Sequence, residues 1–207
     1  MKKKIDIITW NRKEHFEFFS KFEEPFFGTT IQFDCTKAYH KAKELGVSFF
    51  VYYLHKTIVA VNKIENFRYR IENDNVYLFD KINASATILR DDKTFGFSEF
   101  EYDENLNNFE SNFTNEAIRV QNTTGLFTRE YNENIIHFSA LPWVNFTSIS
   151  HSRSFSMPDS CPKFSFGKMT DENGVKKIPM AVYVHHGLID GYHLGLFFEE
   201  FERLMNE

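Results

Sequence analysis

A chain of 207 residues has the length of one domain with a sizeable core, and no break in composition divides residues 1–207. Its net charge of -5 leaves no basic footprint, which excludes nucleic acid and an anionic membrane surface as expected partners. The two cysteines are too few for a disulfide framework, and the lysines at 2–4 are followed by Asp6 rather than by an apolar run. The sequence therefore predicts a single-domain cytoplasmic protein.

The predicted elements mix helices and strands without strict alternation. Helices are expected over 11–21, 36–44, 48–62 and 105–120, although β-branched and aromatic residues leave a strand possible over 48–62. Strands are expected over 29–34, 67–71, 76–79, 86–89, 95–102, 135–140, 143–149 and 163–168. This order indicates an α+β fold rather than repeated βαβ units.

The last strand, over 178–185, leads into the most informative segment of the chain. His186 follows it and is expected to point the same way as the valines before it. Asp190 is a good N-cap for a helix, and Gly187 and Gly191 are expected to leave room for a ligand. The helix has one apolar stripe, formed by Leu194, Phe197, Phe198, Phe201, Leu204 and Met205. The segment thus places an imidazole, a side chain suited to general-base catalysis, on rigid backbone.

Other interpretations of this segment remain open from the residues alone. His186 can be a hydrogen-bonded structural histidine, and Asp190 can be only a helix cap. His185, His186, Asp190 and His193 are all possible metal ligands. Adjacent strand residues point to opposite faces, however, so His185 and His186 cannot easily bind one ion, and no metal site is expected.

Three segments together resemble one enzyme family. Residues 185–191, His-His-Gly-Leu-Ile-Asp-Gly, match the His-His-x-x-x-Asp-Gly signature of the chloramphenicol acetyltransferase family, which acyltransferase domains of 2-oxoacid dehydrogenase complexes and peptide synthetase condensation domains share more loosely. Residues 10–17 and 139–146 resemble two further hallmark segments of that family. The resemblance runs nearly end to end. It implies a two-layer sandwich with a large mixed β-sheet packed by helices, assembled as a homotrimer with active sites at the subunit interfaces.

The resemblance also implies a reaction: direct transfer of an acetyl group from acetyl-CoA, a co-substrate, to a hydroxyl of chloramphenicol, with no permanently bound cofactor. His186 is then the general base, and Ser139 stabilises the tetrahedral oxyanion. Asp190 forms an ion pair with Arg12 that holds the loop of the base, and the imidazole tautomer is fixed by the histidine's own carbonyl. Ser165 corresponds to a family threonine that holds an oxyanion-bridging water.

The CoA-binding residues match the family only in part. Lys168 matches a family lysine near the CoA phosphate, where a cation suits the charge. Ser48 stands in place of a second lysine, and Met169 in place of an aromatic that stacks on adenine. Ser148 is a possible nucleophile by residue type, and a structural role is expected for it.

The acceptor pocket departs further from the family. Phe19, Phe95 and Phe127 occupy aromatic positions of the chloramphenicol pocket, but Phe19 replaces a tyrosine and so lacks a hydroxyl. His151 replaces a pocket leucine, and Ala84 a glutamine. These departures support a second hypothesis, a CoA-dependent O-acyltransferase acting on another small hydroxylated acceptor. A third hypothesis is a catalytically silent trimeric binding protein, which has no need to retain the reaction residues.

Overall fold

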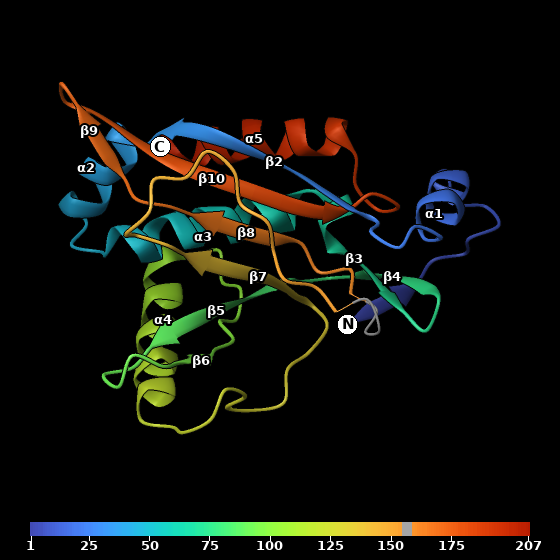
Figure 1. Cartoon of the computed structure of the whole chain (residues 1–207), viewed down its shortest axis with the longest axis horizontal. Coiled ribbons are helices and arrows are strands. Elements are labelled where there is room, and N and C mark those ends of the chain that lie inside the picture. Colours follow the sequence, from blue (N-terminus) through green and yellow to red (C-terminus); the bar gives the residue numbers. More distant parts are fainter. Residues whose placement is uncertain (155–158) are drawn as a thin grey trace.

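The computed structural model describes residues 1–154 and 159–207, and its main feature is a large mixed sheet (Figure 1). The strand order is β2-β10-β8-β7-β5-β6, and β9 pairs with β10. Strands β5, β7 and β8 are parallel, whereas the other neighbours are antiparallel. The strands are β2 (Phe26–Asp34), β5 (Asn83–Leu89), β6 (Phe95–Phe97), β7 (Ile135–Ala140), β8 (Lys163–Phe166), β9 (Thr170–Glu172) and β10 (Val175–His185).

A small antiparallel sheet has the order β1-β4-β3. It consists of β1 (Lys2–Lys4), β3 (Tyr69–Glu72) and β4 (Asn75–Phe79). The helices are α1 (Lys13–Phe19), α2 (Thr36–Glu44), α3 (Phe49–Lys63), α4 (Leu106–Gln121) and α5 (Gly191–Met205), with a 3₁₀ turn at Glu65–Arg68. No helix within the described ranges is long and apolar enough to span a bilayer.

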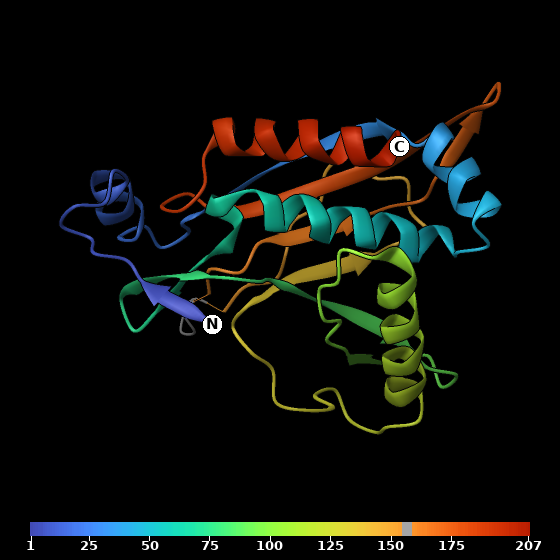
Figure 2. The same cartoon turned by 180° about the vertical axis from the view of Figure 1, so that it is seen from behind.

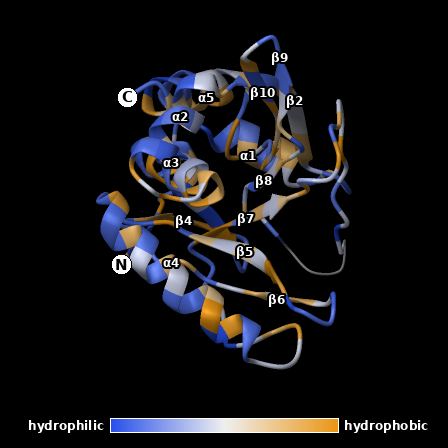
Figure 3. Cartoon of the chain, turned by 90° about the vertical axis from the view of Figure 1, so that its left-hand side faces the viewer, coloured by the Kyte–Doolittle hydropathy of each residue, from blue (hydrophilic) through white to orange (hydrophobic). Residues whose placement is uncertain are grey.

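One face of the large sheet packs against helices. Figure 2 shows α3 and α5 side by side across the strands, and Figure 3 shows the two layers from the side. The apolar positions of β8 point into this layer, where the ring of Phe164 lies 5.1 Å from that of Phe197 and the ring of Phe166 lies 6.0 Å from that of Phe201. The core is therefore the interface between this sheet face and the helices.

The other face of the sheet is polar. Strand residues alternate between faces, so the β8 residues that alternate with Phe164 and Phe166, namely Lys163 and Ser165, point to this face. On β7 the residues beside them are His137 and Ser139. The segment 141–154 and 159–162 lies over this face, on the side opposite the helices (Figures 1 and 3). The Tyr183 hydroxyl fastens the segment to β10 by donating to the carbonyl of Ile149 at 2.6 Å.

The predicted α+β fold with a large mixed sheet is confirmed, and the helix over 48–62 is α3 rather than a strand. The strand predicted over 143–149 is wrong. The chain turns there after Pro142, with the N–H of Val144 bonded to the carbonyl of Leu141 at 3.0 Å, and Trp143 is exposed rather than paired. The strand predicted over 95–102 ends as β6 at Phe97, and the strand predicted over 67–71 begins as a 3₁₀ turn.

Candidate active site

The turn after β10 holds His186 between two aromatic rings. The N–H of His186 donates to the carbonyl of Pro25 at 2.8 Å, and its ring stacks on Phe19 with centroids 3.8 Å apart and planes 7° apart. The ring of Phe27 lies 4.3 Å away. Since Phe27 pairs with Val184 across the sheet, the His186 ring lies on the valine side of β10, as predicted. Two aromatic contacts and a backbone bond therefore fix the imidazole.

The ring nitrogens of His186 have different surroundings. Nδ1 is buried and has no hydrogen-bond partner among the described residues. The resemblance implies that the His186 ring donates to the His186 carbonyl and that this bond fixes the tautomer. In the structure that carbonyl accepts from Arg12 Nη2 at 3.4 Å instead. The hydrogen bond from the ring to the His186 carbonyl is therefore not formed in this structure. Nε2 is the ring nitrogen that remains to contact an acceptor substrate.

Arg12 and Asp190 form an ion pair beside this turn. Arg12 Nη1 donates to Asp190 Oδ2 at 2.8 Å, and the Arg12 side chain is 9% exposed. Asp190 is also the N-cap of α5, because its Oδ1 accepts from the N–H of Tyr192 at 3.1 Å. Burial opposes ionisation of Asp190, but the Arg12 hydrogen bond and the charges of His193 and Arg12 hold its pKa below the ordinary value. One carboxylate thus caps the helix and ties the turn to the N-terminal segment.

Gly187 has a packing role rather than the ligand-approach role predicted for it. A Cβ there would lie 3.1 Å from His185 Cε1 and 3.3 Å from the Cα of Phe16, so the turn closes tightly on its neighbours. The Gly187 N–H donates to His185 Nδ1 at 3.1 Å. The His185 ring lies against Phe26, on the opposite side of the strand from His186. This arrangement disfavours a metal site shared by the two histidines.

Ser139 lies in a second polar cluster. It pairs with Ser165 in the parallel register of β7 and β8, and Ser165 is fully buried. Ser165 Oγ is 3.3 Å from His151 Nε2. The structure thus places three of the predicted site residues together on the polar face of the sheet.

The two clusters are far apart within one chain. Ser139 is aligned with Ser165, which is aligned with Ala181, and His186 lies five residues beyond Ala181 along β10. At about 3.3 Å per residue and about 4.8 Å between strands, Ser139 and His186 are roughly 19 Å apart. A reacting carbonyl must lie within about 3 Å of both base and oxyanion donor, so one copy of the chain does not bring them together.

The predicted acceptor aromatics also separate into two places. Phe19 lies on His186, whereas Phe95 and Phe127 flank Phe97 of β6, with ring centroids 5.8 and 5.4 Å from it. The sequence reasoning missed Phe97 and Tyr131, whose hydroxyl donates to the Phe97 carbonyl at 2.6 Å. The spacing of Phe95 and Phe97 within one strand was the available signal.

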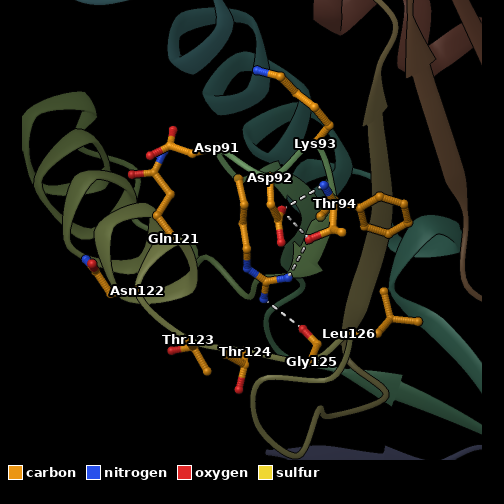
Figure 4. A pocket seen from close by; sticks show the side chains of 12 residues that line it. Asp91, Asp92, Lys93, Thr94, Gln121, Asn122, Thr123, Thr124, Gly125 and Leu126 are labelled. Atoms are coloured by element: carbon orange, nitrogen blue, oxygen red, sulfur yellow. Dashed lines mark hydrogen bonds between the residues drawn. The ribbon is translucent and has the colours of Figure 1, made fainter.

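A cavity of about 990 Å³ opens beside Phe95, between the β5–β6 hairpin and the end of α4 (Figure 4). Arg90 shapes it, since Nη2 donates to the Gly125 carbonyl at 2.7 Å and Nε to the Val120 carbonyl at 3.1 Å. Asp92 fixes the hairpin tip through the N–H and hydroxyl of Thr94. The cavity holds neither of the predicted catalytic side chains.

Lys168 is exposed directly after β8, and its N–H donates to the Val144 carbonyl at 2.8 Å. Ser48 is the N-cap of α3, where its Oγ accepts from the Val51 N–H at 3.2 Å. Lys168 is therefore the cation that remains at the predicted CoA positions. Ser148 is exposed and stays a predicted structural residue.

His137, Asp159 and Cys161 place potential metal ligands within 4.8 Å of one another. Lys163 already forms an ion pair with Asp159 in this cluster. Burial raises the pKa of the Cys161 thiol to about 11, so the thiolate that binds metals is disfavoured. Lys163 thus engages the Asp159 carboxylate in a partly buried ion pair, which competes with binding of a metal at this cluster.

Comparison with known proteins gives one consistent family. The family model for chloramphenicol acetyltransferase matches residues 2–202. The chloramphenicol acetyltransferase of Proteus mirabilis is 28% identical over 204 residues, which are 98% of this chain and 94% of that protein. The enzyme of the same name from Bacillus pumilus is 31% identical over 201 residues, 96% of this chain and 91% of that protein.

Solved structures agree with the sequence comparison. A structure named chloramphenicol acetyltransferase superimposes with a TM-score of 0.90 at 32% identity, over 99% of this chain and 100% of that one. A probable dihydrolipoamide acetyltransferase from Listeria monocytogenes superimposes with a TM-score of 0.67 at 12% identity, over 97% of this chain and 92% of that one. The second likeness concerns the fold alone.

Proposed function

We propose, since the chain belongs to the chloramphenicol acetyltransferase family, that it transfers the acetyl group of acetyl-CoA to a hydroxyl of chloramphenicol and so inactivates the antibiotic. The observation that carries the proposal is the turn of His186, whose ring is stacked on Phe19 and whose backbone is tied by the Arg12–Asp190 pair. Residues 1–207 form one acetyltransferase domain in this account.

The chemistry assigns one proton transfer to each half of the reaction. Nε2 of His186 removes the proton of the acceptor hydroxyl as the oxygen attacks the thioester carbonyl. The hydroxyl of Ser139 donates to the resulting oxyanion, and Ser165 supports it through a bridging water. When the carbon–sulfur bond breaks, His186 returns the proton to the CoA thiolate, so no acetyl-enzyme forms and the base is regenerated.

We further propose a homotrimer, the assembly that the family resemblance implies, and the separation of the two clusters supports a site shared between subunits. Because His186 and Ser139 are roughly 19 Å apart in one chain, one subunit supplies the base and its neighbour supplies the oxyanion donor. Exposed aromatics lie near both clusters. Phe18 and Phe22 lie in and just after α1, which carries the Phe19 ring stacked on His186, and Trp143 follows Ser139 by four residues. Such apolar surface is typical of a protein–protein contact.

Acetyl-CoA acts as a co-substrate rather than a resident cofactor, and Lys168 binds its phosphate groups. We also propose that the protein acts in the cytoplasm, because its proposed co-substrate is acetyl-CoA.

A second candidate is O-acyl transfer to another small hydroxylated acceptor. The hydrogen-bonded His151–Ser165 pair favours it, because this polar pair stands where the family has an apolar side chain.

The proposed function is tested with purified protein, acetyl-CoA and chloramphenicol, by following release of the CoA thiol. Release that depends on chloramphenicol supports the leading proposal. Folded, trimeric protein that releases thiol only with other acceptors supports the second candidate. Absence of release with every hydroxylated acceptor in a broad screen favours the silent binding protein and contradicts both.

A further inference from the structure

His151 is held in a defined orientation by the polar face of the sheet. Its Nε2 is 3.3 Å from the Oγ of Ser165, and its ring meets the edge of Tyr183 with centroids 5.3 Å apart. Tyr183 in turn bonds to the carbonyl of Ile149, two residues before His151. The loop and the imidazole are therefore anchored to β8 and β10 at once.

One nitrogen of this ring has no partner. Nδ1 of His151 makes no hydrogen bond to any residue in the described part of the chain. Burial and the nearby charge of Lys163 both lower the pKa of His151, so the neutral ring carries one donor and one acceptor nitrogen near pH 7. Because Nε2 faces Ser165, Nδ1 is the nitrogen available to a bound molecule.

His151 lies close to the proposed oxyanion donor, Ser139. Ser165 is the register neighbour of Ser139, and side chains at paired positions on one sheet face lie about 5 Å apart. His151 is thus hydrogen-bonded to Ser165, the residue beside the proposed oxyanion donor Ser139. Phe19, the ring on His186, offers no polar group, whereas Nδ1 of His151 offers one.

A nucleophilic Ser–His pair is a poorer explanation of the same contact. Ser165 is fully buried, with 0% of its surface exposed, so a thioester cannot reach its oxygen. A purely space-filling role is served as well by an aliphatic side chain, which needs no hydrogen bond from Ser165.

We propose that His151 determines acceptor specificity by offering Nδ1 as a hydrogen-bonding group beside the reacting hydroxyl. The inference rests on the proposed function and narrows its substrate class. Acceptors with a second hydroxyl close to the acetylated one are preferred over analogues that lack it. The selectivity arises because an analogue without that group leaves a polar ring nitrogen unpaired when the site closes.

The test compares chloramphenicol, which has two hydroxyls, with its deoxy analogue lacking the hydroxyl that is not acetylated. In the wild-type enzyme kcat/KM is expected to be higher for chloramphenicol, the diol, than for the deoxy analogue. His151→Leu is expected to lower the ratio of kcat/KM for the diol to kcat/KM for the analogue roughly tenfold, mainly by raising KM for the diol. His151→Gln, which retains hydrogen-bonding atoms, restores part of the ratio. A His151→Leu enzyme with an unchanged ratio, or with equal losses for both acceptors, overturns the proposal.

Calorimetric binding of the same two acceptors separates this inference from the proposed function. A protein that binds the diol more tightly, and loses that preference in His151→Leu, supports the specificity role even if it releases no CoA thiol. Absence of thiol release then overturns only the proposed reaction. Equal binding of both acceptors by the wild-type protein overturns the role of His151.

Discussion

The turn of His186 and the cluster of Ser139 differ in how completely one chain builds them. At the turn, an aromatic stack, an ion pair and a helix cap hold the base without help from another molecule. The Ser139 hydroxyl makes no hydrogen bond within the described ranges, and Trp143, four residues further along the chain, is 72% exposed. The proposed base is thus held in place within one chain, whereas the proposed oxyanion donor has no hydrogen-bond partner among the described residues.

The largest expected effect is the loss of the base. His186→Ala is expected to lower kcat by about 10⁴-fold, the upper end of what general-base catalysis contributes, with no change in oligomeric state. His40→Ala, which changes an exposed histidine on α2, is the control and should leave turnover unchanged. Steady-state kinetics measure both, and an active His186→Ala enzyme would reject His186 as the base.

Removal of the oxyanion donor is expected to cost less. Ser139→Ala should lower kcat by about 100-fold with KM for acetyl-CoA nearly constant, because the lost bond forms in the transition state. Ser148→Ala replaces an exposed serine on the same stretch of chain and should have no effect. If the two variants have equal kcat values, Ser139 is not the donor.

Acid is expected to destabilise the protein through two histidines, the buried His185 and the half-buried His137. Burial, reinforced by Lys163 near His137 and by Arg153 near His185, lowers both pKa values to about 4, while Asp159 opposes the shift at both. Between pH 6.5 and 4 these two histidines are protonated in the unfolded chain but neutral in the folded protein. The free energy of unfolding therefore falls as the pH falls. Each histidine contributes up to about 3 kcal/mol of this loss.

The measurement is the free energy of unfolding against pH for the wild type and for His185→Gln. The variant is expected to be less stable at pH 7 but to have a shallower slope between pH 6.5 and 4, because one of the histidines whose pKa the fold lowers is gone. Parallel slopes for the two proteins would mean that His185 is not held neutral by the fold.

The Arg12–Asp190 pair should have the smallest of these effects. Asp190→Asn keeps an oxygen that can cap α5 but removes the charge that faces Arg12, and about 2 kcal/mol of stability should be lost. A several-fold fall in kcat should accompany it as the turn loosens. Glu17→Gln, which breaks an exposed pair with Lys13 at 4.0 Å, should change stability by less than about 0.5 kcal/mol. Equal stability of the Asp190→Asn variant and the wild type would contradict the role of the ion pair.

The turn of His186 was largely predictable from sequence because its signals are local. The alternation of β10, the Asp190 cap and the apolar stripe of α5 all lie within about thirty residues, and the structure has these elements where they were predicted. The strand predicted over 143–149 failed because apolar residues indicate burial without saying against what. Trp143 and Val144 are exposed in the single chain, which suits a subunit contact better than a strand.

The arrangement of the site could not be predicted from the residues alone. The distance between Ser139 and His186 depends on the registers of β7, β8 and β10, which are set by contacts between distant segments. The contact of His151 with Ser165 depends on the path of a loop over the sheet. The family resemblance named His186 and Ser139 as site residues, but only the fold shows that these two side chains lie on different parts of the subunit.

Complementation between two inactive variants tests most directly whether the site is assembled from two subunits. His186→Ala and Ser139→Ala chains, carrying different affinity tags, are coexpressed and the mixed trimers are purified. If neighbouring subunits supply the two side chains, one interface in each mixed trimer receives both intact, and activity recovers to about a third of the wild-type value. If one chain supplies both, every site keeps a defect, and activity that stays at the level of the Ser139→Ala enzyme would contradict the account.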